Sequence, residues 1–229
     1  MSADKQYFKG SVNPINAIRA FRYDMSFYRN NPDYFDPDGL WIFCGAQGSG
    51  KTLSAVKCLK KLCKQYPKAI VCTNLEIKGL DREIIPFVAY EQLSTLSNGL
   101  HGVIFLIDEI HVLWNSLESK NIPINEMAVF CQMRKERRII LGTSQVYGRI
   151  AKPIREQLKY VVTCKSFFKY IQWNTIIDPN DIPNQGSQDN DANLDGSIIG
   201  HSLFFHSPED YKAYQTLNKI ERIERKGKK

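Results

Sequence analysis

The segment Gly45-Ala46-Gln47-Gly48-Ser49-Gly50-Lys51-Thr52 decides the fold of this chain. It matches the phosphate-binding loop (P-loop) pattern G-x-x-x-x-G-K-[ST] at every position. The glycines allow the tight turn that points backbone N–H groups at phosphate oxygens, while Lys51 reaches the β and γ phosphates and Thr52 offers its hydroxyl to Mg²⁺. We therefore predict a site for a nucleoside triphosphate and Mg²⁺. The residues expected to contact the nucleotide are Gly45, Ala46, Gln47, Gly48, Ser49, Gly50, Lys51, Thr52 and Leu53.

The segments on either side of the P-loop have the structure that the motif requires. Residues 40–44 form a short apolar run of strand type, and residues 53–66 carry apolar side chains at helical spacing. A strand, a glycine loop and a helix place a bound anion at the helix N-terminus, where free N–H groups and the helix dipole favour negative charge.

Composition indicates an ordinary globular protein. The chain has 229 residues, of which 43% are hydrophobic and 24% charged, and none of its apolar stretches approaches the length of about 20 residues that a membrane span needs. The six cysteines contain no C-x-x-C pair and lie in apolar runs, so we interpret them as reduced core residues of a cytosolic protein.

The order of apolar runs predicts an α/β fold. After the P-loop unit, further strands are expected at residues 69–73, 103–107, 138–143 and 160–164, with helical or loop segments between them. Strands that alternate with helices favour a mostly parallel sheet covered on both faces. We predict three regions: a helical extension over residues 1–38, an ATPase core over 39–165, and a C-terminal part over 166–229 that belongs to the same domain.

The C-terminal part differs in pattern from the core. Residues 166–177 and 197–206 are expected to form a β-hairpin around the acidic loop 178–196, and Pro208 starts a last helix. Near the other end of the chain, Asn13-Pro14 is a helix start, with Asn as the N-cap and Pro in the first turn.

Two carboxylates follow the third predicted strand. Asp108 and Glu109 come directly after the apolar run 103–107, which is the Walker B arrangement. Asp108 is expected to hold Mg²⁺ opposite Thr52, and Glu109 to act as the general base that polarises the attacking water. Together with the P-loop, this pair predicts hydrolysis of the nucleotide rather than binding alone.

Other polar residues are candidates for supporting roles. Gln145 follows the strand 138–143 and is the predicted sensor of the γ-phosphate, with Ser144 as second choice and a plain polar strand end as the alternative. An arginine from a neighbouring subunit often stabilises the transition state, and Arg134 is our first candidate for it and Arg155 the second. Either arginine could equally be a surface residue or a DNA contact.

Basic residues are concentrated in one part of the chain. The net charge is +7, and residues 131–169 contain ten Lys and Arg residues against two Glu residues. Such a segment is typical of a phosphate-binding surface, although a solvated face is the open alternative.

Further motifs occur in a fixed order along the chain. They are Thr73-Asn74, Ile107-Asp108-Glu109, Gln132-Met133-Arg134, residues 139–145, Arg155 and Tyr211-Lys212-Ala213-Tyr214-Gln215-Thr216. This order resembles the zonular occludens toxin (Zot) family, part of the FtsK/HerA superfamily of ring-forming, DNA-moving ATPases, whose members are typical of bacteriophages. The resemblance covers residues 40–217, and its more specific features are Asn74, Arg134 and Gln145.

The resemblance implies a P-loop ATPase of the additional-strand, catalytic-Glu type, with helices flanking a sheet in the order 5-1-4-3-2. It also implies a homo-oligomeric ring, a hexamer or pentamer, that binds double-stranded DNA through backbone phosphates. Filamentous-phage members carry a transmembrane helix after the ATPase domain, and none precedes Lys229 here. We therefore expect a genome-packaging motor without a direct membrane span, in the host cytoplasm or at the virion vertex, with a capsid vertex or portal protein as partner.

Two alternatives remain open at this point. One is a phage assembly or export ATPase that works with a membrane partner, and the other is a nucleotide-gated binding switch. No Asn-Lys-x-Asp guanine-binding motif follows the fourth strand, which favours ATP as the nucleotide.

Overall fold

The computed structural model describes residues 13–182, 194 and 196–215, and the chain divides into two compact units, residues 1–34 and 35–229. The first unit contains helix α1 (Pro14–Asn30), which begins where the sequence predicts. The Asn13 side chain accepts a hydrogen bond of 3.0 Å from the Ile15 N–H, and Pro14 occupies the first turn. The predicted division at residues 38 and 165 stays a prediction.

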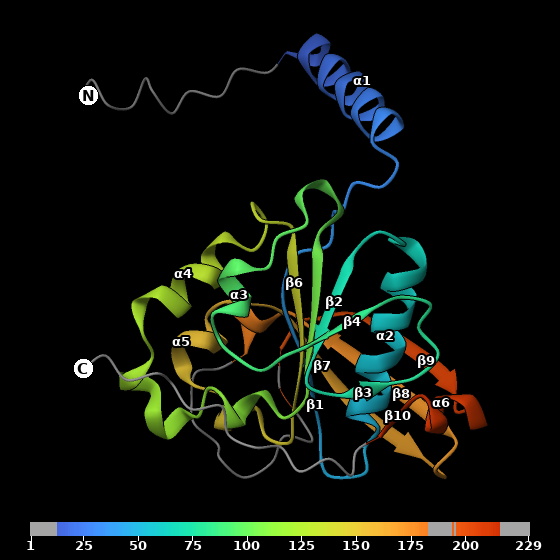
Figure 1. The fold of residues 1–229 in the computed structure, drawn as a ribbon, viewed down its shortest axis with the longest axis vertical. Coiled ribbons are helices and arrows are strands. Elements are labelled where there is room, and N and C mark those ends of the chain that lie inside the picture. Colours follow the sequence, from blue (N-terminus) through green and yellow to red (C-terminus); the bar gives the residue numbers. More distant parts are fainter. Residues whose placement is uncertain (1–12, 183–193, 195, 216–229) are drawn as a thin grey trace. The chain divides into compact units, whose positions relative to one another are not determined.

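An eight-stranded sheet forms the centre of the second unit, in the order β4-β2-β5-β6-β1-β7-β8-β9 (Figure 1). The six neighbouring strands β4, β2, β5, β6, β1 and β7 pair in parallel, whereas β8 pairs antiparallel with both β7 and β9. The short strands β3 and β10 form a second, two-stranded sheet. The strands are β1 (Gly39–Cys44), β2 (Ile70–Thr73), β3 (Glu76–Ile77), β4 (Ile84–Pro86), β5 (Val103–Ile107), β6 (Arg138–Ser144), β7 (Leu158–Phe167), β8 (Ile171–Ile177), β9 (Ile198–Phe205) and β10 (Tyr214–Gln215).

The predicted fold class is confirmed. The five strands expected in the order 5-1-4-3-2 are β7, β1, β6, β5 and β2, and they are neighbours in that order. The full sheet differs in detail, because β4 extends it at one edge and the hairpin β8–β9 at the other. Most of the acidic loop 178–196 lies outside the described residues.

The boundary between β7 and β8 differs from the sequence prediction. The sequence predicts one strand over residues 160–164 and another over 166–177, but β7 extends to Phe167 and β8 begins at Ile171. Phe168 and Lys169 have φ angles of 51° and 64°, which reverse the chain between the strands. Glycine or asparagine usually fills such positions, so the residue types gave no turn signal.

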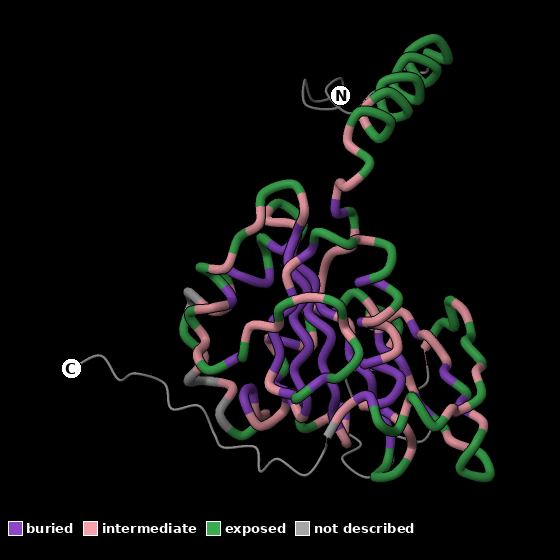
Figure 2. Tube along the Cα trace, turned by 45° about the vertical axis from the view of Figure 1, so that its right-hand side comes forward, coloured by how far each residue is buried: buried purple, intermediate pink, exposed green. Residues whose placement is uncertain are grey.

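Helices cover both faces of the sheet (Figure 1). Ile104 and Leu106 of β5 pack with the apolar face of α2, while Phe105 and Ile107 pack with residues of α3, α4 and α5 on the other side. The purple interior in Figure 2 follows these strands. A strand buried on both faces explains why the run 103–107 is apolar throughout. The helices are α2 (Lys51–Gln65), α3 (Gln92–Thr95), α4 (Ile124–Gln132), α5 (Lys152–Arg155) and α6 (Pro208–Lys212).

The parallel register brings the ends of three strands to one edge. Cys44 of β1 lies opposite Ser144 of β6, and Ile107 of β5 lies opposite Gly142. The P-loop, the Asp-Glu pair and Gln145 all follow these ends, so the fold gathers them at the carboxyl edge of the sheet. Within the described ranges, none of the helices is both long and apolar enough to cross a membrane.

Candidate active site

The P-loop connects β1 to the N-terminus of α2. Gly50 is the N-cap of α2 with a left-handed φ of 82°, and a Cβ built there would lie 2.0 Å from the Gln172 Oε1 atom. Gly45 has a φ of 150°, and its Cβ would lie 2.7 Å from the Cys164 carbonyl oxygen. Glycine is therefore required at both positions, first for the backbone angle and second for the close approach of neighbouring atoms.

Lys51 is buried at the start of α2, although it carries a charge. Its Nζ donates a hydrogen bond of 3.1 Å to the Ala46 carbonyl, across the P-loop. The first turn of α2 contains no acidic residue. An ammonium group and free helix N–H groups thus face the same loop, which suits an anion such as a phosphate.

Thr52 and Asp108 meet between α2 and β5. The Thr52 hydroxyl donates to Asp108 Oδ1 over 2.9 Å, and the Thr143 hydroxyl on β6 donates to the same oxygen over 2.6 Å. These oxygen donors fit Mg²⁺, which commonly takes one or two protein oxygens and completes its shell with water and phosphate. Among residues 13–182, 194 and 196–215 there is no group of three His, Cys, Asp or Glu that would form an all-protein metal cage. Thr52 and Asp108 are therefore the residues that could hold the ion.

Asn74 fixes the backbone of Asp108 from the neighbouring strand. It follows β2, and its side chain accepts a 2.9 Å hydrogen bond from the Asp108 N–H and donates one of 3.1 Å to the Asp108 carbonyl. An amide that satisfies both backbone groups of one residue holds that residue in a single orientation. This contact gives Asn74, one of the residues behind the Zot resemblance, a definite structural task.

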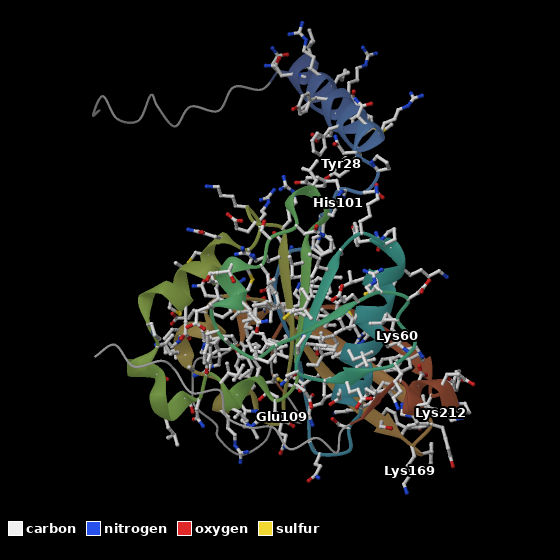
Figure 3. All side chains as sticks on the ribbon, in the orientation of Figure 1. Tyr28, Lys60, His101, Glu109, Lys169 and Lys212 are labelled. Carbon is white, nitrogen blue, oxygen red and sulfur yellow. The ribbon has the colours of Figure 1, made fainter. Side chains whose placement is uncertain are left out.

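Glu109 leaves the strand in an unusual backbone conformation. Its φ is 52°, and its N–H donates to the Thr143 hydroxyl over 2.9 Å. A left-handed conformation is uncommon for a residue other than glycine, asparagine or aspartate, and such outliers cluster at functional sites. Figure 3 shows Glu109 and His101 at opposite ends of β5, with Glu109 at the carboxyl edge of the sheet.

The Glu109 carboxylate lies between two side chains. Gln145 Nε2 donates to Glu109 Oε1 over 3.2 Å, and His111 Nδ1 lies 3.2 Å from Glu109 Oε2. Burial lowers the pKa of His111, the charge of Glu109 acts in the opposite direction, and the nearby charges of Arg149 and Lys51 lower the pKa further. A neutral His111 ring therefore borders the carboxylate at neutral pH.

The two predicted arginines lie in different places. Arg134 is exposed in the turn before β6, which is the amino edge of the sheet and is opposite to the P-loop. Arg155 belongs to α5 and stacks over the Tyr147 ring, with 5.3 Å between the guanidinium carbon and the ring centroid. Arg149, in the 3-10 turn after β6, is the arginine whose charge acts on His111 beside Glu109. In its own chain Arg149, at the carboxyl edge of the sheet, therefore lies nearer to His111 than Arg134 does at the amino edge.

The structure also shows residues that sequence reasoning missed. Thr143 bonds to both Asp108 and Glu109, and His111 borders Glu109. Thr143 is the last residue of the predicted strand 138–143, directly before the polar residues Ser144 and Gln145. Its hydroxyl in an otherwise apolar run was the sequence feature that could have marked it as a site residue. His111 had no signal of its own, since a single histidine two residues after a carboxylate is common.

No protein-family model matches the sequence, and no curated protein matches it. The N-terminal domain of zonular occludens toxin from Neisseria meningitidis is 15% identical, with 77% of this chain and 98% of that chain covered and a TM-score of 0.55. The genome packaging NTPase B204 from Sulfolobus turreted icosahedral virus 2, in complex with ATP-gammaS, is 12% identical over 75% of this chain and 98% of that chain, with a TM-score of 0.49. The flagellar accessory protein FlaH from Methanocaldococcus jannaschii is 11% identical over 61% of this chain and 77% of that chain, with a TM-score of 0.41. The predicted resemblance to Zot is thereby confirmed for the fold.

Proposed function

We propose that this chain is an Mg²⁺-dependent ATPase that moves double-stranded DNA. Our leading proposal for its role is a viral genome-packaging motor. The observation that carries the proposal is the pairing of Thr52 with Asp108 at 2.9 Å, with Glu109 hydrogen-bonded to Gln145 beside them. A protein that only binds nucleotide does not need a second, separately positioned carboxylate at the phosphate end of its site.

The P-loop and Lys51 account for binding of the triphosphate. Lys51 Nζ would exchange the Ala46 carbonyl for oxygens of the β and γ phosphates, which are stronger acceptors because they are charged. Thr52 and Asp108 would hold Mg²⁺, which neutralises charge that develops on the β and γ oxygens.

Glu109 and Gln145 account for hydrolysis. The Glu109 carboxylate would accept a proton from water as the water oxygen bonds to the γ-phosphorus and the bond from that phosphorus to the bridging oxygen breaks. Gln145 is well placed to report on the γ-phosphate, because its amide already contacts Glu109 from the adjacent strand. A γ-phosphate that attracts this amide would release the carboxylate toward water.

DNA contact is proposed for the exposed part of the basic segment 131–169. Arg138 does not belong to it, because its guanidinium is buried and donates to the Leu96 and Ser94 carbonyls. Seven basic residues of the segment are exposed: Arg134 and Lys135 before β6, Arg149 after β6, Lys152 at the start of α5, Lys159 near the start of β7, and Lys165 and Lys169 on the hairpin β7–β8. Contacts through phosphates predict binding that is insensitive to sequence and strongly weakened by salt.

Assembly and partners follow from the same proposal. Arg134 lies at the amino edge of the sheet, so a role in hydrolysis requires it to reach the site of a neighbouring subunit. We propose a homo-oligomeric ring of five or six copies that docks on a capsid vertex or portal protein in the host cytoplasm.

The test is the ATPase rate with and without double-stranded DNA at low salt, for wild type, Lys51→Ala and Glu109→Gln. We expect DNA to stimulate the wild type and both variants to lose nearly all turnover. Lys61→Ala, at an exposed position on α2, is the matched control and should hydrolyse ATP as wild type does. If DNA leaves the wild-type rate of hydrolysis unchanged, the proposed DNA movement is contradicted, whereas the proposed ATPase activity is retained.

One alternative is favoured by a specific observation. The fold similarity to the Zot N-terminal domain, with a TM-score of 0.55, suits an assembly or export ATPase that works with a membrane partner. Affinity purification from infected cells separates the two: capsid vertex proteins favour packaging, and envelope proteins favour export. A nucleotide-gated switch would instead show negligible turnover that Glu109→Gln leaves unchanged.

A further inference from the structure

The hairpin strand β8 lies outside the five-strand core, yet its side chains reach the P-loop. Gln172 of β8 is fully buried, and its Nε2 donates a hydrogen bond of 3.0 Å to the Ser49 carbonyl within the loop. The same Nε2 donates to Asn174 Oδ1 over 2.9 Å. Both hydrogens of the amide are therefore used, and one of them holds the P-loop backbone.

Asn174 extends the contact to helix α2. It is 4% exposed, and its Oδ1 also accepts a hydrogen bond of 3.1 Å from the Ser54 hydroxyl. Residues 172 and 174 lie on the same face of β8, because side chains alternate along a strand. This face thus contacts both the last part of the P-loop and the first turn of α2.

The amide oxygen of Gln172 lies against Gly50 and has a neighbour from the C-terminal part of the chain. His206 Nε2 lies 3.3 Å from Gln172 Oε1, and His206 Nδ1 lies 2.7 Å from the Tyr211 hydroxyl. Tyr211 in turn donates to the Lys169 carbonyl over 2.8 Å. His206 is only partly buried and Tyr211 is exposed, so the buried contacts that hold the amide are those with Ser49 and Asn174.

The contact with Ser49 determines one peptide orientation in the P-loop. The Ser49 carbonyl and the Gly50 N–H belong to the same planar trans peptide and point in opposite directions. Because Gln172 holds the carbonyl on the β8 side, the Gly50 N–H points away from β8. Gly48 and Gly50 both have positive φ angles, so without such a contact this part of the loop has wide conformational freedom.

We propose that Gln172 is a positioning residue for the nucleotide site: it orders the P-loop in its anion-binding conformation, with Asn174 and Ser54 as the second attachment. This inference rests on the proposed nucleotide binding and adds a role for the accessory hairpin in it. Ordering the loop before the ligand arrives removes an entropy cost from binding. Its loss should therefore act on affinity for nucleotide more than on the hydrolytic step.

The test is equilibrium binding of a non-hydrolysable ATP analogue with Mg²⁺, together with thermal unfolding, for wild type and Gln172→Met. Methionine keeps the length and volume of the side chain but cannot donate to Ser49. We expect the Kd to rise by about tenfold, since hydrogen bonds contribute about 0.5–1.5 kcal/mol each and two are lost. In steady-state hydrolysis, KM should rise by a similar factor while kcat changes less than about threefold.

Two further variants complete the design. Ser54→Ala removes the second attachment without touching Gln172, and should raise Kd by about threefold, so it tests the proposal even if Gln172→Met does not fold. Thr175→Ala, on the opposite face of β8, is the matched control and should bind as wild type does. If Gln172→Met and Ser54→Ala both fold and bind the analogue with the wild-type Kd, the positioning role is overturned, while the proposed nucleotide binding stands. Failure of the wild type to bind the analogue would overturn the proposed function and this inference with it.

Discussion

Gln145 donates a hydrogen bond of 3.2 Å to Glu109, which joins the ends of the adjacent strands β6 and β5. The other carboxylate oxygen of Glu109 lies 3.2 Å from the His111 ring, and the Glu109 backbone has a φ of 52°. The proposed catalytic base is thus oriented by its own backbone and by Gln145 at Oε1, while Oε2 is buried without a hydrogen-bond partner among the described residues. Substitutions at these positions and around them separate the steps of binding, metal attachment and hydrolysis.

Glu109→Gln should abolish hydrolysis and preserve nucleotide binding. General base catalysis contributes about 10²–10⁴-fold to a rate, and the amide cannot accept the proton from water. Binding is kept because Lys51, Thr52 and the P-loop are unchanged. Phosphate release in a single turnover and equilibrium binding of ATP measure the two effects separately. Release within about threefold of the wild-type rate would remove Glu109 from the catalytic role.

Thr143→Val should weaken the metal attachment and the fold together. The Thr143 hydroxyl donates to Asp108 Oδ1 and accepts from the Glu109 N–H, so valine removes both hydrogen bonds at a buried position. We expect a loss of about 1–3 kcal/mol in the free energy of unfolding and a higher Mg²⁺ concentration for half-maximal turnover. Denaturant titration and a Mg²⁺ titration of the ATPase rate measure them.

The matched control is Thr143→Ser, which keeps the hydroxyl. Its Mg²⁺ concentration for half-maximal turnover should lie within about twofold of the wild-type value, since the two hydrogen bonds remain available. Equal Mg²⁺ requirements for Thr143→Val and wild type would show that the hydroxyl only stabilises the fold.

His111 should make stability depend on pH in a defined direction. Burial lowers its pKa in the folded state below the ordinary value of 6.5, so the unfolded chain binds the proton more readily. Stability from this group is fully present above about pH 6.5 and is lost as the pH falls from there toward the folded pKa. His111→Gln should therefore reduce the fall in unfolding free energy between about pH 7.5 and 5.5. A pH profile identical to that of the wild type would contradict this assignment.

The core of the fold follows from local signals that tertiary structure does not override. The P-loop requires a strand before it and a helix after it, and the apolar run 103–107 requires burial on both faces, which is how β5 packs. The order of the five strands came from the resemblance to a family rather than from periodicity, because hydrophobic pattern does not specify which strands are neighbours. The turn at Phe168 and Lys169 could not be predicted, since bulky residues with positive φ are rare.

The candidate site shows a similar division. Lys51, Thr52, Asp108, Glu109 and Gln145 were found because they lie in motifs or at strand ends. Thr143, His111 and Gln172 were not, because their importance depends on contacts with residues about 2 to 123 positions away in the chain that only the fold creates. The catalytic roles of Arg134 and Arg155 stay predictions.

Arg134 should act between subunits if it acts in hydrolysis at all, because it lies at the amino edge of the sheet in its own chain. An arginine supplied in trans contributes about 10³–10⁵-fold to turnover in related chemistry, so Arg134→Ala alone should be nearly inactive. Lys51→Ala is also expected to be inactive, but it retains Arg134. Mixing the two variants should restore part of the activity, since some interfaces then combine an intact P-loop with an intact arginine. Arg149→Ala is the comparison: the charge of Arg149 acts on His111 in its own chain, so mixing with Lys51→Ala should leave the turnover of Arg149→Ala, counted per intact P-loop, unchanged. Recovery in the Arg149 mixture and none in the Arg134 mixture would exchange the roles of the two arginines.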